Sequence, residues 1–260
     1  MSAVKEGLRR TVTSIFPSLV AIALILIALQ FVIPLLRVPS YILPVPSAVF
    51  AQFTTGRIPW FEHTFATLEE VFAGFALAVI GGIALAVSMV LSRPLRAVIE
   101  PLIVAAQVIP KVAFAPVLFL WLGLNVLPRI LTVFLVCFFP IVIDAVAGFE
   151  SAEQEMLDLV TSFDSSKLVL LRKVQIPSAL PSIFAGFRVA AGLALVGAVV
   201  AEFISSSSGL GFLILSSQVS LNTPLMFAAA TVLIMVGFLF YGSVALLERI
   251  FVPWRDVKHA

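Results

Sequence analysis

Lys111 is the most unusual charged residue of the sequence, because it lies inside an apolar stretch between Pro110 and Pro116. An ionisable side chain in such a stretch is costly and usually serves a function. Proline interrupts a helix and frees backbone carbonyls, which a cavity can satisfy. We therefore expect Lys111 either to face a solute path and contact an anionic or polar solute, or to neutralise an acidic side chain or cap the freed carbonyls.

Arg188 and Glu202 share another apolar stretch and are 14 residues apart. On an α-helix this spacing puts them within about 40° on one face but about 21 Å apart along the axis, so they cannot pair. Glu202 precedes the polar run Ser205–Ser208 and can serve an outer gate or contact a binding protein. Snorkelling to the membrane surface or a local hydrogen bond is the more ordinary explanation. With Lys111 and its two prolines, they are the candidate translocation-path residues.

Residues for metal, nucleophilic or nucleotide chemistry are scarce. The chain has two histidines and one cysteine, which makes a dedicated zinc or haem site a poor expectation. His63 is expected in a loop and His259 lies at the C-terminus, so neither can join a catalytic pair within a span. No phosphate-binding motif GxxxxGK[ST] occurs. We predict no cofactor on this chain and no ATP hydrolysis by it.

Composition predicts the environment of these residues. Of the 260 residues, 61% are hydrophobic and 12% are charged, and the mean hydropathy is +1.17. Soluble domains have roughly 45–50% apolar and about 25% charged residues. The composition therefore excludes a soluble enzyme, a disordered tail and a nucleic-acid-binding module, and the scattered basic residues form no phosphate-tracking stripe. We predict an all-α membrane protein without a nucleic-acid partner.

Six apolar stretches are long enough to cross a bilayer, which takes about 20 residues per helix. They cover residues 15–36, 65–91, 97–122, 130–149, 183–204 and 225–247. The basic start before the first stretch is also typical of a signal peptide, but the stretch is too long for one and no small-residue cleavage site follows cleanly. We predict one transmembrane domain over residues 1–260 with six spanning helices.

Loop charges predict the orientation, because basic residues concentrate on the cytoplasmic side. With the N-terminus inside, eleven of the sixteen Lys and Arg residues lie in inner loops and three in outer loops, while Lys111 and Arg188 lie within spans. The opposite orientation reverses this bias. Both termini are therefore predicted to be cytoplasmic.

The segment 151–177, between the fourth and fifth spans, predicts two short helices on the cytoplasmic side. Ser151 and Gln154 form a capping box. Apolar residues then follow helical spacing: Met156, Leu159, Val160 and Phe163. Residues 164–166 favour a turn, and Pro177 ends the second helix. Such a pair can dock to a cytosolic partner, rest on lipid headgroups or pack under its own spans.

Small residues form one face of the fifth span, within an arc of about 80°. They are Gly186, Ala190, Ala194, Gly197 and Ala201. Small side chains let helices approach closely. We expect this face to pack against another helix, either within the subunit or at a dimer or gate interface.

The segment 151–177 resembles the cytoplasmic coupling loop of binding-protein-dependent ABC importer permeases. That family has a motif E-A-A-x-x-x-G, followed downstream by an apolar residue and proline. Aligned from Ile176 and Pro177, the acidic position falls on Asp158 and the glycine position on Asp164. Asp158 keeps the acidic type of the motif, but Leu159 and Val160 replace its two alanines and Asp164 replaces its glycine. Three further segments are similar to the branch of the family that handles nitrate, sulfonates, taurine and thiamine precursors: LPVPSAVF, IPKVAFAPVLFLWLG and ALPSIFAGFRVAAG. The resemblance covers about residues 43–254.

The resemblance implies the fold of a type I importer permease in the inner membrane. It implies a second copy of the permease, two ATP-hydrolysing subunits that hold ATP and Mg, and an extracytoplasmic substrate-binding protein. It also implies that the coupling segment seats in the ATPase through Asp158, Phe163, Asp164, Ser165 and Lys167. The candidate solutes are a thiamine pyrimidine or other vitamin precursor of the flavin type, sulfonate or taurine, and nitrate.

Two other functions compete with this one. A stand-alone secondary transporter needs coupling-ion carboxylates and often an internal repeat. No repeat is found, and Asp144, Glu202 and Glu100 are the available carboxylates. An intramembrane enzyme needs paired Asp residues or Ser with His inside the spans, and the sequence offers neither. The coupling segment favours the importer permease.

Overall fold

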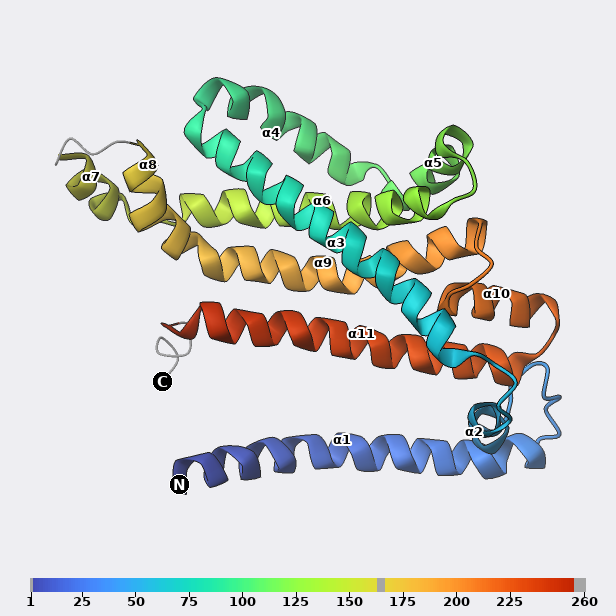
Figure 1. The fold of residues 1–260 in the computed structure, drawn as a ribbon. Helices are drawn as coiled ribbons and strands as arrows, with labels where there is room; N and C mark the ends of the chain where they lie inside the picture. Colours follow the sequence, from blue (N-terminus) through green and yellow to red (C-terminus); the bar gives the residue numbers. More distant parts are fainter. Residues whose placement is uncertain (1, 163–166, 255–260) are drawn as a thin grey trace. The chain divides into compact units, whose positions relative to one another are not determined.

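The computed structural model describes residues 2–162 and 167–254, which form helices joined by short loops (Figure 1). The elements are α1 (Ser2–Leu35), α2 (Pro46–Thr54), α3 (Trp60–Leu91), α4 (Arg93–Val108), η1 (Lys111–Phe114), α5 (Ala115–Leu122), α6 (Val126–Glu150), α7 (Gln154–Ser162), α8 (Lys167–Leu170), η2 (Leu171–Gln175), α9 (Ile176–Ile204), α10 (Leu210–Val219) and α11 (Thr223–Phe251). No strand occurs in this described part of the chain, so the all-α prediction is confirmed for it.

The chain divides into two compact units. The first takes in α1, α2 and residues Leu213–Thr231, and the second takes in Trp60–Phe212 and the chain from Val232 onward. In the first unit, Gln30 holds the start of α2: its Nε2 donates to Ser47 Oγ and its Oε1 accepts from the Ser47 amide, both at 3.0 Å. The single domain predicted for the whole chain stays a prediction.

Four helices are long and apolar enough to cross a membrane: α3, α6, the continuous helix Leu168–Ile204 and α11. A further candidate is a broken span, in which α4 and the helical stretch Lys111–Leu122 meet at 89°. The third predicted span is therefore two helices at a sharp angle. Pro110 stands at the break, where its missing N–H group cannot continue the helix. The described helices support four to five spans, and six stays a prediction.

Helices α3, α6 and α9 form the core of the second unit, with α6 packed along both of the others (Figure 1). Their contact surfaces are apolar and fully buried, as Val71, Val133 and Ala194 illustrate. Helix α11 joins through Phe240, whose ring packs edge-on against Phe72 and Phe75 at centroid distances of 5.1 and 5.2 Å. This core sets the positions of the buried polar side chains described below.

Two predicted helix ends are wrong. Ser151 does not begin a helix: it ends α6, and its hydroxyl donates to the Gly148 carbonyl at 2.8 Å. A serine side chain can bond backbone groups at either end of a helix, and here the carbonyl end is nearer. Pro177 does not end a helix either, because α9 runs through it. The wide π-helical turn η2 ends at Gln175, two residues before Pro177, and such a turn relieves the clash between a proline ring and the preceding carbonyls.

Candidate functional site

The carboxylate of Glu202, at the end of α9, holds the N-terminus of α10. Its Oε2 accepts from the amides of Gly211 and Phe212, the latter at 3.2 Å, and its Oε1 accepts the Thr67 hydroxyl at 2.6 Å. Glu202 is 1% exposed. A negative charge is stabilised at a helix N-terminus, where amides lack partners within the helix. Glu202 therefore ties α9 to α3 and to the start of α10.

The two preceding amides of this turn are bound from α3. The Leu210 N–H donates to Thr67 Oγ1 at 2.8 Å, and the Gly209 N–H donates to His63 Nδ1 at 3.1 Å. Four consecutive amides, 209–212, thus have side-chain partners on other elements. Side chains of α3 and α9 therefore hold the turn between α9 and α10.

Glycine is required at two positions of this turn. Gly209 has a φ of +118°, a conformation that residues with a Cβ rarely adopt. A Cβ added at Gly211 would lie 2.7 Å from Glu202 Oε2, well inside contact distance. Both glycines let the backbone close around the carboxylate.

Arg129 of α6 brings a positive charge to the same place. Its Nη1 pairs with Glu70 Oε1 of α3 and donates to Ser206 Oγ at 3.0 Å. The side chains of Arg129 and Glu70 are 15% and 1% exposed, and Arg129 also acts electrostatically on Glu202. Glu70 Oε2 is buried and has no hydrogen-bond partner among the described residues. We call this group the buried polar cluster: His63, Thr67, Glu70, Arg129, Glu202 and Ser206.

The sequence predicts a site role for only one member of this cluster, Glu202. His63, expected in a loop, lies in α3, and the prediction from the sequence names neither Glu70 nor Arg129. The sequence offers one signal, which is that each charged residue stands at the edge of an apolar stretch. Spacing along the chain could not pair Arg129 with Glu70, 59 positions away, or Glu202 with Thr67, 135 positions away. Among residues 2–162 and 167–254, no three His, Cys, Asp or Glu side chains are grouped so that they could hold a metal ion.

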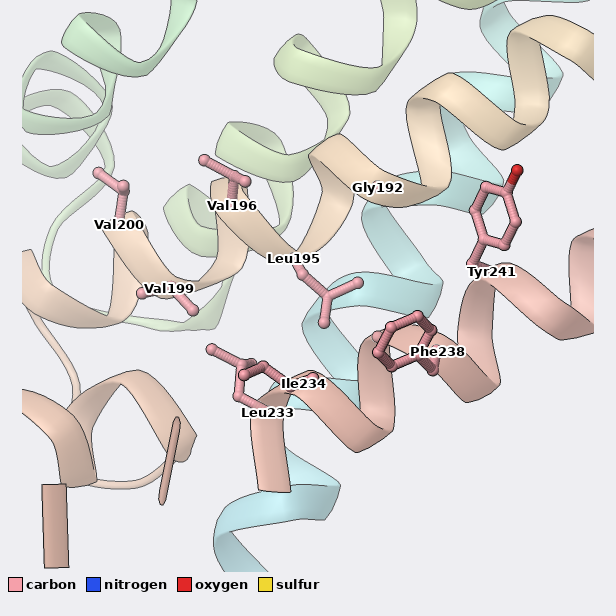
Figure 2. Close-up of a pocket in the computed structure, with 10 residues that line it drawn as sticks. Gly192, Leu195, Val196, Val199, Val200, Leu233, Ile234, Phe238 and Tyr241 are labelled. Carbon is pink, nitrogen blue, oxygen red and sulfur yellow. The ribbon is translucent and has the colours of Figure 1, made fainter. Parts of the chain in front are cut away.

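Arg188 does not pair with Glu202, in line with the predicted separation. Its Nε lies 3.1 Å from Glu248 Oε2, which joins α9 to α11. A cavity of about 590 Å³ lies between the same two helices (Figure 2). In Figure 2, Leu195 of α9 points toward Phe238 of α11. The described lining residues carry no charge, so the cavity is an apolar space next to an ion pair.

Lys111 lies in η1, at the bend between α4 and α5. Its Nζ donates to the Gln107 carbonyl at 3.3 Å and stands 5.2 Å from the centroid of the Phe139 ring. Pro110 precedes η1, and Pro116 occupies the first turn of α5, where proline is tolerated. Lys111 thus caps a carbonyl freed by the break, which is one of the expected alternatives. Its role in a solute path stays a prediction.

The small residues of the fifth predicted span are all buried in α9, and several lie against α6: Gly186, Ala190, Ala194, Gly197 and Ala201. A Cβ added at Gly197 would lie 3.1 Å from Val133 Cα, and one added at Gly186 would lie 2.8 Å from Asp144 Cβ. The backbones of α6 and α9 therefore approach each other closely within one chain.

The substitution Gly197→Ala should lower the free energy of unfolding by about 1–3 kcal/mol, because overpacking a tight contact costs this much. The α6 backbone must move to make room. Gly192→Ala, also in α9, is the matched control: a Cβ there meets nothing within 4 Å, and alanine is favoured over glycine in a helix by about 1 kcal/mol. Chemical unfolding of the purified chain in mixed micelles measures both. Equal stabilities of the two variants would contradict the tight contact.

The predicted coupling segment contains α7 and α8, followed by the turn η2. Met156 and Leu159 on α7 are 49% and 55% exposed, and Asp158 is exposed and accepts from Gln154 Nε2 at 2.9 Å. Lys167 opens α8. The other three residues predicted to contact an ATPase, Phe163, Asp164 and Ser165, lie outside the described residues. Helix α7 therefore presents an apolar face that the described chain leaves uncovered.

Comparison with known families gives a match over most of the second unit. Residues 78–252 match the family described as "Binding-protein-dependent transport system inner membrane component". The match takes in α6, α9 and the segment between them.

Individual relatives extend over nearly the whole chain. A probable ABC transporter permease protein of Haemophilus influenzae is 37% identical, over 87% of this chain and 92% of its own. The riboflavin transport system permease protein RibX of Chloroflexus aurantiacus is 36% identical, over 91% and 89%. The formylaminopyrimidine transport permease protein ThiX of Halalkalibacterium halodurans is 32% identical, over 83% and 86%.

A solved structure shows the same fold. A chain of the inward-facing MetNI methionine ABC transporter superposes with a TM-score of 0.59 at 14% identity. The match covers 73% of this chain and 94% of that one.

Proposed function

Because the chain belongs to the family of binding-protein-dependent transport system inner membrane components, we propose that two copies of it form the membrane part of an ATP-driven importer. The chain is a multi-pass inner membrane protein and the permease subunit of an ABC importer, like the relatives that match most of its length. ATP binding and hydrolysis, with Mg, fall to two separate ATPase subunits. An extracytoplasmic binding protein delivers the solute.

The exposed apolar face of α7 carries the proposal for the ATPase contact. Met156 and Leu159 are about half exposed at the end of the molecule where α6 ends and α8 begins. The fully buried core of a protein interface is apolar and enriched in methionine, so a partner that covers these two side chains gains from burying them. In the proposed complex α7 and α8 seat on the ATPase, and closure of the ATPase pair moves them. The two short helices lead directly through η2 into α9, which can carry that movement into the spans.

The proposed orientation places both termini and the segment 151–177 in the cytoplasm. The distribution of Lys and Arg over the loops supports this orientation. The turn between α9 and α10, which the buried polar cluster holds, then lies on the opposite side. There it is positioned to meet a binding protein or to close the path.

The candidate solutes come from the relatives and the family. The named cargoes of RibX and ThiX are riboflavin and a formylaminopyrimidine, and other members of the branch handle taurine, sulfonates or nitrate. We propose a vitamin or vitamin precursor, since the relatives named for these cargoes are 36% and 32% identical to this chain.

Affinity purification of the tagged chain from membranes of its own host, in mild detergent, tests this function. Mass spectrometry should find an ATP-hydrolysing subunit at about one per permease, because each copy offers one α7–α8 surface. Native mass measurement should find two permease copies in the complex. A homo-oligomer that carries no ATPase under conditions that preserve its fold would contradict the proposal and revive a secondary transporter.

A further inference from the structure

His63, in the first turn of α3, holds the turn between α9 and α10 through a bond that only a neutral imidazole can make. Its Nδ1 accepts the amide of Gly209 at 3.1 Å. A nitrogen that accepts carries no proton, so the ring proton of this tautomer is on Nε2. The side chain is buried, and its ring stacks on that of Phe212 at a centroid distance of 6.0 Å. Packing therefore holds the imidazole in the plane that aims Nδ1 at the turn.

Protonation of His63 removes this acceptor. An imidazolium carries a proton on both ring nitrogens, so no rotation of the ring restores the bond to the amide. The bond to Gly209 is buried, and a buried N–H group without a partner costs about as much free energy as a lost hydrogen bond. The new positive charge also lies in the first turn of α3 and faces the amides at the start of α10, and a helix N-terminus disfavours a cation. The folded turn therefore requires the neutral form.

The charged groups around His63 offer the imidazolium little in return. Glu62, its neighbour on α3, favours a positive charge electrostatically, but Glu62 is exposed, where water and salt screen its charge. The carboxylate of Glu202 on α9 is already bound by one hydroxyl and two amides. Glu70 pairs with Arg129 of α6, and its Cα is about 10 Å further along α3. Among the described residues no carboxylate forms an ion pair with His63.

We propose that His63 is an acid-sensitive latch, which holds the α9–α10 turn by the Gly209 amide when it is neutral and releases that amide when it is protonated. An unperturbed histidine titrates near pH 6.5, so the release belongs to mildly acidic conditions. The latch depends on contacts within the chain and not on the proposed function. In the proposed orientation the turn lies on the extracytoplasmic side, so the pH of the outer medium sets its state.

Hydrogen exchange of the full-length chain in mixed micelles tests the latch at pH 7.5 and pH 5.5, with fragmentation mass spectrometry to resolve single amides. After correction for the intrinsic pH dependence of exchange, the Gly209 amide should lose about tenfold in protection at pH 5.5. This factor follows because one pH unit below a pKa near 6.5 shifts a linked equilibrium about tenfold. The Leu127 amide is the internal control: the uncharged Asn125 side chain accepts it at 2.8 Å, so its protection should not change.

His63→Asn separates the histidine from the other groups that titrate. The Oδ1 of asparagine stands where Nδ1 stood and accepts an amide at either pH, so the Gly209 amide should be equally protected at both. His259→Asn removes the other histidine of the chain and should show the same tenfold loss as the unaltered chain. Equal protection of Gly209 at the two pH values in the unaltered chain would overturn the inference. A tenfold loss that persists in His63→Asn would also overturn it and assign the effect to the buried carboxylates.

A measurement on the unaltered chain tests the same inference without a substitution in α3. Because the sequence has two histidines, nitrogen NMR of the ¹⁵N-histidine-labelled chain gives two sets of ring signals, and His259→Asn identifies which set belongs to His63. At pH 7.5 the ring of His63 should show an unprotonated Nδ1 and a proton on Nε2. A proton on Nδ1 at this pH would leave the Gly209 amide without its acceptor and refute the latch.

Discussion

Replacing Arg129 with methionine should lower the free energy of unfolding by about 3–5 kcal/mol, because removing one partner of a buried ion pair leaves the other charge uncompensated. That other charge is Glu70, which is 1% exposed and already has one oxygen without a partner among the described residues. The Ser206 hydroxyl also loses its contact with the guanidinium. Chemical unfolding of the purified chain in mixed micelles measures the loss.

Arg96→Met is the matched control for this prediction. Arg96 also pairs with carboxylates, those of Glu100 and Glu150, but its side chain is 33% exposed and theirs are 47% and 45% exposed. Exposed ion pairs contribute about 0–1 kcal/mol, so this variant should lose no more than that. Equal losses at Arg96 and Arg129 would show that the burial of the Glu70 pair has no energetic consequence.

A double variant separates charge from packing. In Arg129→Met with Glu70→Met, both ends of the pair are apolar, and replacing a whole buried pair by apolar residues is often neutral. Most of the stability lost in the single variant should therefore return. If the double variant is as unstable as Arg129→Met alone, the arginine acts by filling space between α3 and α6 or by compensating Glu202, rather than by compensating Glu70.

The helices themselves could be predicted because they depend on local sequence. The apolar stretches 65–91 and 130–149 lie within α3 (Trp60–Leu91) and α6 (Val126–Glu150). Each helix begins a few residues earlier than its apolar stretch, since polar residues can continue a helix beyond the apolar run. The break at Pro110 agrees with the missing N–H group of proline, but residue type alone does not determine it, because α6 and α9 continue through Pro140 and Pro181.

Helix ends and polar contacts could not be predicted in the same way. Ser151 has the side chain of a cap at either end of a helix, and the sequence does not say which end is near. The partners of Glu202 depend on how α3 lies against α9, which places Thr67 beside it from 135 residues away. Arg129 and Glu70 meet for the same reason. Such contacts depend on packing, which a pattern within one helix does not determine.

Replacing Leu159 with aspartate should abolish coupled transport while leaving the fold intact. Leu159 is 55% exposed, and a substitution at an exposed position usually changes stability by no more than about 0.5 kcal/mol. At the proposed ATPase contact the same change buries a charge in place of an apolar anchor. Burying that unpaired charge costs about 2 kcal/mol or more, roughly a 30-fold weaker association. Co-purification of the ATPase and solute-stimulated ATP hydrolysis measure the effect.

Gln154→Asp introduces the same side chain on the opposite face of α7. Gln154 is exposed and opens the helix, where an acidic residue is favoured by the unpaired amides. Residues 154 and 159 are five positions apart, about 140° around the helix axis, so Gln154 lies outside the apolar face, although its Nε2 donates to Asp158. Gln154→Asp loses that bond, a change of about 0.2–0.5 kcal/mol, but no apolar contact, so it should keep the ATPase bound and reduce transport far less than Leu159→Asp. If Leu159→Asp keeps both as well, the exposed face of α7 is not the coupling surface. If both variants lose the ATPase equally, the cause is the added negative charge on the segment and not the loss of an apolar anchor.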